Sequence, residues 1–435
     1  SALGDIGVDA LAEAVGALCR TDYARREGEP FSAKAYRVRR VGGVRYTYVK
    51  VTSGVLRARD EVRTRSGVCK AAAILAPQGG RLLPMGEAHA GQTAALAGLS
   101  ARPGERIGDG FGLEAPETVP LMSVQVEPMA PLTQSALLAH LREMEEEDPL
   151  LSVRPEADGV SVGVMGAVQV EVLQGILAAR FGDVVRMCQP HVLYKETIAA
   201  PVVGIGHYEP LRHYAEVWLK LEPGAPGSGV SFAADCPPNS LEENWQRLIR
   251  THVFERAHPG VLTGSPLCDV RIRLIAGRAH LKHTEGGDFR EATCRAIRNA
   301  LMQAENVLLE PVVRFELAMP NEALARVTGE LLRIGAQLDA SETDGGETTL
   351  TGRCTAAMFW DYPTRFAAST RGHGRIASRF DRYEPCKNQD DIVRQSGYDP
   401  LADTLNPPGS VFCSHGAGFY VAWDHVREWA HCEVE

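Results

Sequence analysis

The chain has 435 residues, of which 44% are hydrophobic and 23% are charged, and its formal net charge is −9. A single hydrophobic core stops growing at roughly 250–300 residues, so this length predicts several domains. No apolar run approaches the roughly 20 residues that a membrane helix needs, which argues against a membrane protein.

The ten cysteines are scattered along the chain and form no Cys-x-x-Cys pair. That spacing is typical of reduced thiols in a cytoplasmic protein and not of a disulfide framework. A zinc site is the alternative, because Cys413, His415, His431 and Cys432 supply suitable donor atoms. The paired spacing of zinc motifs is absent, so the sequence favours buried thiols, ordinary histidines and no metal.

Charge is distributed unevenly along the chain. Residues 245–300 contain ten Lys/Arg and five Asp/Glu, whereas residues 390–435 contain two Lys/Arg and eight Asp/Glu. A basic segment in an acidic chain is compatible with contacts to RNA phosphates, and a merely solvated surface is the alternative.

Residues 5–19 place apolar side chains at helical spacing, which predicts an amphipathic helix that needs a partner surface. Residues 31–60 alternate apolar and polar side chains around two turns, Gly42-Gly43 and Ser53-Gly54, and short strands continue to about residue 120. This pattern predicts a small all-β barrel at residues 29–119.

Two later segments, residues 120–197 and 312–386, share the element order β-α-β-β-α-β of ferredoxin-like modules. Between them, residues 198–311 carry strands, a Gly-rich loop and two helices, which predicts a βαβ-type domain. Residues 387–435 form a C-terminal extension with a hairpin and a short helix, and a cap on the last module is one option for it. The expected fold class is multidomain α+β: a β-barrel followed by two ferredoxin-like modules that bracket a βαβ-type domain.

Specific runs within these segments carry a family resemblance. LREMEEEDPLLSV (141–153), VGVMGAVQVEVLQGIL (162–177) and QPHVLYKET (189–197) resemble the third domain of elongation factor G and the tetracycline ribosomal-protection proteins. RGHGRIASRFDRYEP (371–385) resembles the closing strand of their fifth domain. The resemblance covers about residues 1–386 in one collinear order and implies domains II to V of a translational GTPase. The run Gly166-Ala167-Val168-Gln169 departs from the Gly-Glu-Leu-His of the factor itself, as the protection proteins tend to do.

The first residues resemble the end of the GTPase domain in this family. Ser1, Ala2 and Leu3 are similar to its last nucleotide-contacting motif, so residues 1–28 are expected to be a remnant of that domain and the chain to be trimmed. We find no phosphate loop, no credible switch motif and no base-reading motif. No catalytic residue and no cofactor are therefore expected here, whereas the resemblance implies GTP and Mg²⁺ in a full-length parent.

The resemblance also implies that loops at the tip of domain IV reach the ribosomal decoding centre. Two loops match by position, and we expect their residues to contact ribosomal RNA: Gly227, Ser228 and Gly229 in the first, and Lys282, His283, Thr284, Glu285, Gly286, Gly287 and Asp288 in the second. Glycines allow a close approach to RNA, Lys282 suits a phosphate and His283 suits a base. For the second loop with His280, a plain polar loop and a metal-hydrolase cluster are the alternatives.

A further concentration of His207, Tyr208, His213 and Trp218 is explained by strand packing, so no site is assigned there. The expected partner is the ribosome near its A site, with no membrane and a monomeric chain. Tetracycline protection is the favoured role, although Leu281-Lys282-His283 stands where protection proteins carry a Ser-Pro-Val type run. An elongation factor G paralogue and a stand-alone RNA-binding module are the other functions, and a metal-dependent enzyme would require stoichiometric metal.

Overall fold

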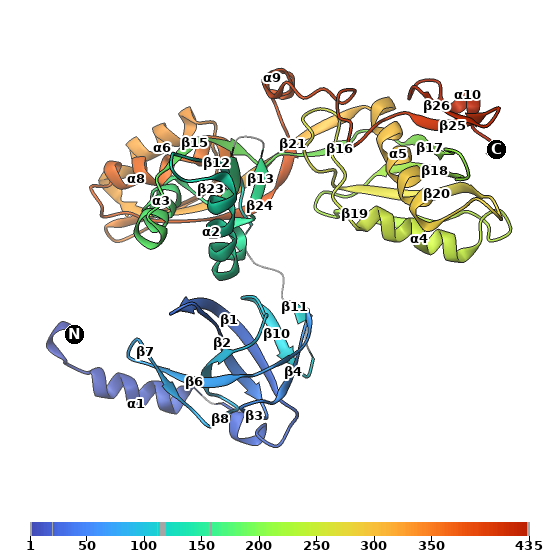
Figure 1. Cartoon of the computed structure of the whole chain (residues 1–435). Coiled ribbons are helices and arrows are strands. Elements are labelled where there is room, and N and C mark those ends of the chain that lie inside the picture. The colour runs from blue at the N-terminus through green and yellow to red at the C-terminus, as the bar shows by residue number, and fades with distance from the viewer. Residues whose placement is uncertain (1, 20, 111, 114–118, 157–158, 433–435) are drawn as a thin grey trace. The chain divides into compact units, whose positions relative to one another are not determined.

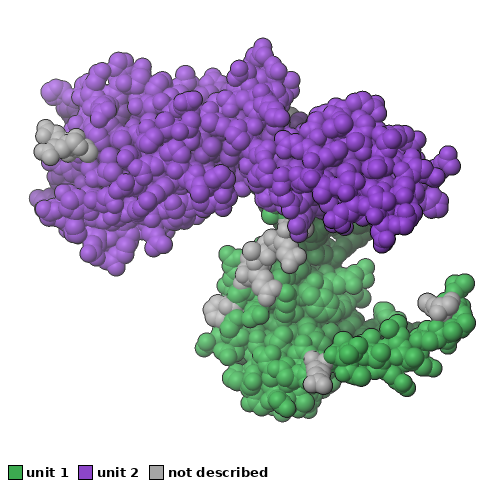
Figure 2. Space-filling view, turned by 180° about the vertical axis from the view of Figure 1, so that it is seen from behind, with its two compact units in different colours: residues 1–190 green, residues 191–435 purple. Residues whose placement is uncertain are grey.

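The computed structural model describes all residues except 1, 20, 111, 114–118, 157–158 and 433–435 (Figure 1). The chain divides into two compact units, residues 1–190 and residues 191–435, which are coloured separately in Figure 2. Its several mixed and antiparallel sheets with helices confirm the predicted multidomain α+β class. Within the described residues, no helix has the length and apolar character needed to cross a membrane.

The first unit begins with helix α1 (Val8–Leu18), which has the predicted amphipathic pattern but no buried residue. Leu11, Val15 and Leu18 are all exposed. The apolar face of this helix is therefore uncovered by the part of the chain that the structure describes.

The β-domain follows and is built around the long hairpin of β1 (Ser32–Val41) and β2 (Val44–Ser53), which turns at Gly42-Gly43 as predicted. Seven strands form one sheet in the order β11-β10-β1-β2-β9-β6-β7, and the pairs β3-β8 and β4-β5 complete the domain around a single apolar core. The pairings among described residues leave this sheet open instead of closing it into one ring. The other strands are β3 (Val55–Arg57), β4 (Glu61–Thr64), β5 (Gly67–Lys70), β6 (Ala73–Gln78), β7 (Arg81–Pro84), β8 (Glu87–His89), β9 (Thr93–Ala97), β10 (Glu105–Gly108) and β11 (Gly112–Leu113).

The first module has the predicted β-α-β-β-α-β order and the sheet order β13-β14-β12-β15 of a ferredoxin-like fold. Thr133 begins its first helix by accepting a hydrogen bond from the backbone N–H of Ala136, and Gly182 ends the second in a left-handed conformation. Its elements are β12 (Met122–Pro128), α2 (Gln134–Glu147), β13 (Arg154–Glu156), β14 (Gly159–Val164), α3 (Ala167–Phe181) and β15 (Val185–Val192).

The central domain, in the second unit, contains four strands with helices α4 and α5 packed on the sheet (Figure 1). Strands β19 and β20 run parallel and are joined through α4, which confirms the βαβ unit. Its elements are β17 (Val202–Tyr208), β18 (Ala215–Pro223), β19 (Val230–Ala234), α4 (Glu243–Phe254), β20 (Val270–Ala279) and α5 (Gly286–Gln303).

Helix α5 lies unusually close to β17 because two glycines leave room for its backbone. A Cβ atom on Gly204 would lie 2.0 Å from the carbonyl oxygen of Ala296, and one on Gly206 would lie 1.9 Å from that of Ala292. Small residues on both elements therefore set the position of α5, and with it the loop that precedes this helix.

The second module repeats the ferredoxin-like order, with the strand sequence β24-β21-β23-β22 across its sheet. Strand β16 (Lys195–Ile198), which comes before the central domain, pairs antiparallel with the beginning of β21, which comes after it. The module consists of β21 (Asn306–Pro320), α6 (Leu324–Arg333), β22 (Gln337–Asp344), β23 (Glu347–Thr355), α7 (Ala356–Phe359), α8 (Tyr362–Ser369) and β24 (Arg375–Pro385).

The C-terminal extension returns to the central domain, so the option that it caps the last module is wrong. Its hairpin, β25 (Ser410–Ser414) and β26 (Ala417–Val421), joins the central sheet because β25 pairs in parallel with β17, which gives the order β19-β20-β18-β17-β25-β26. Phe412, Val421 and Val426 of the extension pack with Ile205 and Trp218 in a second apolar core. The remaining helices of the extension are α9 (Gln389–Ser396) and α10 (Val426–Trp429).

Candidate functional site

The loop of residues 280–285, between β20 and α5, is held rigidly by its own side chains. Thr284 accepts a hydrogen bond from the backbone N–H of His280 at 2.7 Å and donates its hydroxyl to the carbonyl of Tyr214 at 2.6 Å. Glu285 and Asp288 form a capping box at the start of α5. The Oδ1 atom of Asp288 also lies 2.8 Å from the Nδ1 atom of His213. Thr284, Glu285 and Asp288 therefore shape the loop, while Gly286 and Gly287 begin the helix.

The same loop presents two side chains that nothing else in the described structure engages. Leu281 is fully exposed at 100%. The ammonium group of Lys282 makes no ion pair or hydrogen bond with any described residue. Beside them the rings of His280 and His283 stack with their centroids 4.6 Å apart. An exposed apolar side chain, a free cation and stacked imidazoles on a fixed loop suit a partner that offers both charge and flat rings.

The Gly-rich loop of Gly227, Ser228 and Gly229 lies at the other end of the sheet, which corrects the expectation of one shared tip. Strand β18 runs antiparallel to β20, with Ala215 opposite Ala279 and Pro223 opposite Val270. The loop after Pro223 and the loop after Ala279 are thus separated by the length of β20, about 30 Å for ten residues. Sequence position alone did not reveal at which end of the strand pair each loop falls.

The backbone donors of the Gly-rich loop are already occupied. The N–H groups of Gly227 and Gly229 donate to the two carboxylate oxygens of the buried Asp269 at 3.0 and 2.9 Å. An RNA phosphate would have to displace this carboxylate to use the same donors. RNA contact at this loop remains a prediction, and the geometry favours the loop of residues 280–285 instead.

The loop that does lie beside residues 280–285 is that of residues 209–214, between β17 and β18. The links Thr284 to Tyr214 and Asp288 to His213 join the two loops directly. The sequence prediction assigned no site here because the histidines and aromatics were attributed to strand packing. The usable signal was the antiparallel β17-β18 pair, which brings residues 209–214 to the same end of the sheet as the end of β20.

An open pocket of about 700 Å³ lies against these loops. It combines aromatic and cationic side chains, and no Asp or Glu among the described residues, which end at Cys432, lines it. Its functional lining consists of Tyr214, Arg278, His280, Leu281, Lys282 and His431. His431 comes from the extension, more than 130 residues after the loop of residues 280–285 in the sequence. The extension therefore forms one wall of a site that the sequence analysis had assigned to the loop alone.

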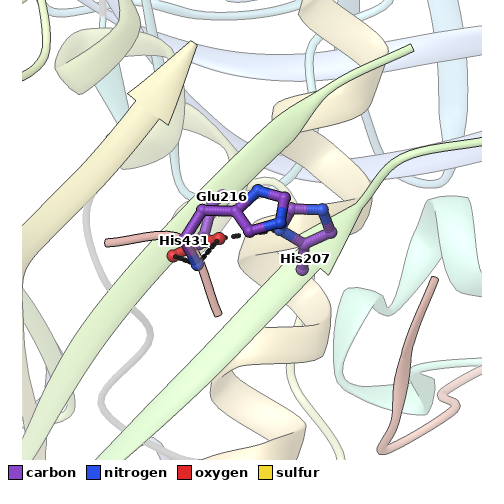
Figure 3. A group of neighbouring side chains, drawn as sticks. All are labelled: His207, Glu216 and His431. Atoms are coloured by element: carbon purple, nitrogen blue, oxygen red, sulfur yellow. Dashed lines mark hydrogen bonds and ion pairs between the residues drawn. The ribbon is translucent and has the colours of Figure 1, made fainter. Parts of the chain in front are cut away.

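His431 connects the pocket to a buried hydrogen-bond network centred on Glu216, and Figure 3 draws His207, Glu216 and His431 of this network. The Oε2 atom of Glu216 is 2.8 Å from Nδ1 of His207, and both side chains are completely buried. Glu216 also accepts hydrogen bonds from the indole N–H of Trp218 and from the backbone N–H groups of His431 and Cys432. Burial alone would raise the pKa of Glu216, but these hydrogen bonds, led by that of His207, outweigh burial and lower the pKa to about 2.

The second nitrogen of His207 faces another carboxylate. Its Nε2 atom lies 3.1 Å from Oε2 of Glu209, which also accepts from the backbone N–H of Cys413. The ring stacks on Phe412 at 4.0 Å. The two carboxylates on either side of His207 therefore bind both parts of the extension, the hairpin and the segment near its end.

The donor atoms of His207, Glu216 and His431 all lie within 4.8 Å of one another, which is close enough for them to share a metal ion. Their hydrogen bonds favour a network of direct contacts between these side chains instead. Both nitrogens of His207 and both oxygens of Glu216 are engaged, and the Nδ1 atom of His431 lies 3.0 Å from the hydroxyl of Tyr214. Cys413 and Cys432 belonged to the zinc site that the sequence offered as its disfavoured alternative. Both donate a backbone N–H group to a carboxylate of the network, and the thiol of Cys432 also hydrogen-bonds Glu216.

Part of the basic segment that was predicted to face RNA holds the acidic extension instead. Arg298, almost completely buried, donates to the hydroxyl of Tyr398 at 2.6 Å and to the carbonyl of Pro400 at 3.3 Å, and it lies 3.8 Å from Asp403. Arg295 donates to the carbonyl of Gly409 at 2.8 Å. The opposite charges of residues 245–300 and 390–435 thus reflect, in part, contacts between the two segments.

The predicted nucleotide-motif remnant, Ser1, Ala2 and Leu3, belongs to the first unit. Ser1 lies outside the described residues, and Ala2–Gly4 form a short 3₁₀ helix. Leu3 is fully exposed. Its role in nucleotide binding remains a prediction.

Two family models match the second unit of the chain. Residues 190–305 match elongation factor G, domain IV, and residues 307–392 match the elongation factor G C-terminus. Residues 190–305 and 307–392 are therefore similar to these two elongation factor G domains. The domain IV match includes both loops of the site, residues 209–214 and 280–285, whereas the extension beyond residue 392 lies outside both matches.

A solved structure with a similar fold spans more of the chain. A crystal structure of a protein from Thermus thermophilus superposes with a TM-score of 0.54 at 24% sequence identity. The match covers 90% of this chain and 61% of the other, so this chain spans about three fifths of that protein's length. At this identity the likeness concerns the fold alone, and it extends over the first unit as well as the two matched domains.

Proposed function

We propose that this chain is the ribosome-binding part of an elongation factor G-like translational GTPase, and that its domain IV acts at the decoding centre of the A site. The single observation that carries the proposal is the rigid loop of residues 280–285 within the domain IV match, which presents Leu281 and Lys282 to solvent. Preorganisation matters because a loop that is already fixed loses little conformational entropy when it binds.

Lys282 and His283 are the residues assigned to direct contact. A lysine ammonium suits a phosphate of the RNA backbone, and an imidazole suits an unpaired base. Thr284, Glu285 and Asp288 act by holding the loop, while Gly286 and Gly287 allow α5 to begin close to it.

The wider role is part of the same proposal. The working protein binds GTP and Mg²⁺ through a GTPase domain, acts as a monomer in the cytoplasm and uses hydrolysis to time its release from the ribosome. Within this class we propose tetracycline protection as the specific role, supported by the resemblance of residues 141–197 and the departure at Gly166-Ala167-Val168-Gln169. The alternatives are an elongation factor G paralogue without a role in drug resistance and a stand-alone RNA-binding module.

The first test is co-sedimentation of the 435-residue chain with vacant 70S ribosomes, using the wild type and the pair Lys282→Ala/His283→Ala. We expect roughly tenfold weaker binding for the pair, from one lost phosphate contact and one lost base contact. Arg271→Ala is the matched control, because this exposed cation lies near the opposite end of β20. No sedimentation of the wild-type chain with ribosomes would reject the proposal.

The role is tested in the full-length parent with a non-hydrolysable GTP analogue and release of labelled tetracycline from ribosomes. Nucleotide-dependent binding with drug release supports protection. Nucleotide-dependent binding without drug release assigns the parent to the elongation-factor-like alternative. Ribosome binding that is the same with and without the GTP analogue indicates the stand-alone RNA-binding module.

A further inference from the structure

The pocket against the loop has the size and chemistry of a nucleotide site. Its volume of about 700 Å³ falls within the range of roughly 300–1,000 Å³ that is typical of ligand sites. Two cations, Arg278 and Lys282, and the rings of Tyr214, His280 and His431 line it. The absence of a lining carboxylate among the described residues and the presence of two cations disfavour a metal cation and favour an anion.

Aromatic rings beside cations are the combination that binds unpaired nucleotides. Bases stack on flat side chains in single-stranded RNA complexes, while Arg and Lys neutralise the backbone phosphates. The rings of Tyr214 and His431 are nearly parallel, 10° apart, with their centroids 5.8 Å apart. The hydroxyl of Tyr214 lies 3.0 Å from Nδ1 of His431 and fixes this arrangement.

We propose that this pocket takes one unpaired nucleotide of ribosomal RNA, and that the docked extension completes the pocket by supplying His431. The inference rests on the proposed function, because it names the partner that the site would bind, and it adds a contributor that lies outside both family matches. Arg278 contacts the nucleotide phosphate and links the loop to the extension, since its guanidinium donates to the carbonyl of His431 at 3.4 Å.

The position of His431 is set by its backbone, so its ring can be removed without releasing the extension. The N–H groups of His431 and Cys432 donate to the buried Glu216 at distances between 2.7 and 3.1 Å. Substitution of the side chain leaves these backbone bonds in place and removes the ring that lines the pocket, together with its hydrogen bond to the hydroxyl of Tyr214. This separates a contact role of His431 from a structural one.

The test compares ribosome binding of His431→Ala with that of His425→Ala in the full 435-residue chain. His425 is an exposed histidine of the same extension outside the pocket, which makes it the matched control. Loss of one stacked base weakens binding by roughly tenfold, so we expect this effect for His431→Ala and none for His425→Ala. Arg278→Gln should weaken binding and reduce its salt dependence, as expected for a lost phosphate contact.

Two readouts keep the outcomes separate. Hydrogen exchange of residues 410–432 shows whether the extension remains docked in each variant. If the extension loosens in His431→Ala, ribosome binding by Arg278→Gln is the result that tests the pocket. Photo-crosslinking from p-benzoylphenylalanine at position 281, with position 405 as the exposed-leucine control, identifies the contacted nucleotide. Crosslinks to one RNA position that weaken in Arg278→Gln support the inference.

The results that would contradict the pocket inference differ from those that would contradict the proposed function. If the wild type binds ribosomes and both His431→Ala and Arg278→Gln bind like His425→Ala, the pocket inference fails and the proposed function stands. If the wild type does not bind ribosomes, the proposed function itself fails and the pocket inference fails with it.

Discussion

His207 and Glu216 face each other across strands β17 and β18, with Nδ1 and Oε2 2.8 Å apart and neither side chain exposed. The pair connects the central sheet to the end of the chain, because the same carboxylate accepts the backbone N–H groups of His431 and Cys432. It therefore lies at the junction between the domain IV-like fold and the extension that completes the pocket.

Glu216→Gln should destabilise the second unit by about 3 kcal/mol, because it replaces a buried carboxylate that accepts several hydrogen bonds with a neutral amide and leaves His207 facing that amide. Urea unfolding measures this change, and faster hydrogen exchange at residues 410–432 should accompany it. Glu428→Gln, a change to an exposed carboxylate in the same extension, is the control and should change the free energy of unfolding by less than about 0.5 kcal/mol.

Acidification should release the extension. The pKa of Glu216 is lowered to about 2 in the folded protein, below the usual 4.5, so its contribution to stability is present above pH 4.5 and is lost as the pH falls toward 2. Burial, with the neighbouring His207, lowers the pKa of His431 as well, so protonation of this ring below about pH 6.5 opposes docking in the same direction. Hydrogen exchange of residues 410–432 as a function of pH checks both effects, and protection that rises on acidification would contradict them.

Arg298→Ala should loosen residues 398–406 without unfolding the central domain. The guanidinium donates to the carbonyls of Gly260 and Pro400 and to the hydroxyl of Tyr398, and its removal leaves these acceptors without their donor. A cost of about 3 kcal/mol is expected for losing such a buried charged group. Limited proteolysis should show new cleavage in this segment, whereas Arg394→Ala, which removes an exposed arginine of α9, should leave the pattern unchanged.

Gly206→Ala should be among the most damaging single changes in the second unit. The added Cβ would meet the carbonyl oxygen of Ala292 at 1.9 Å, so α5 must move away from β17, at a cost of about 3 kcal/mol or more. Gly287→Ala near the start of the same helix has open space around its Cβ and should leave stability unchanged or slightly increased. Thermal unfolding of the two variants compares them directly, and equal melting temperatures would show that the close packing is not limiting.

The modules were predictable from the sequence because their signals are local. The helix of residues 324–333 and the turn at Asp344-Gly345-Gly346 give the order of elements in the second module without knowledge of the fold. The docking of the extension was not predictable in this way, since His207 and Ser410, 203 residues apart, meet only after β25 has joined β17. Only the opposite charges of residues 245–300 and 390–435 pointed to it.

Only part of the candidate site could be predicted from the sequence, because some of its residues come together only through the fold. Residues 282–288 were predicted as contact residues because their composition and family position agree, and their contact with RNA stays a prediction. The Gly-rich loop at 227–229 was grouped with them in error, because glycine content reveals a turn but not the strand end at which the turn falls. Tyr214 and His431 were missed as contributors because each becomes part of the site only through strand register and the return of the extension.

The antiparallel pairing of β16 with β21 means that the chain enters the central domain and leaves it through two neighbouring strands, residues 195–198 and 306–309. These strands form a short stem at the edge of the five-stranded sheet of the second module, and the extension crosses the same boundary a third time. A load applied at residues 280–285 would be shared between this stem and the extension. Pulling on the loop should therefore detach the extension or separate β16 from β21 before it disturbs the pairing of strands β17 to β20, so we expect the extension to act as a mechanical brace.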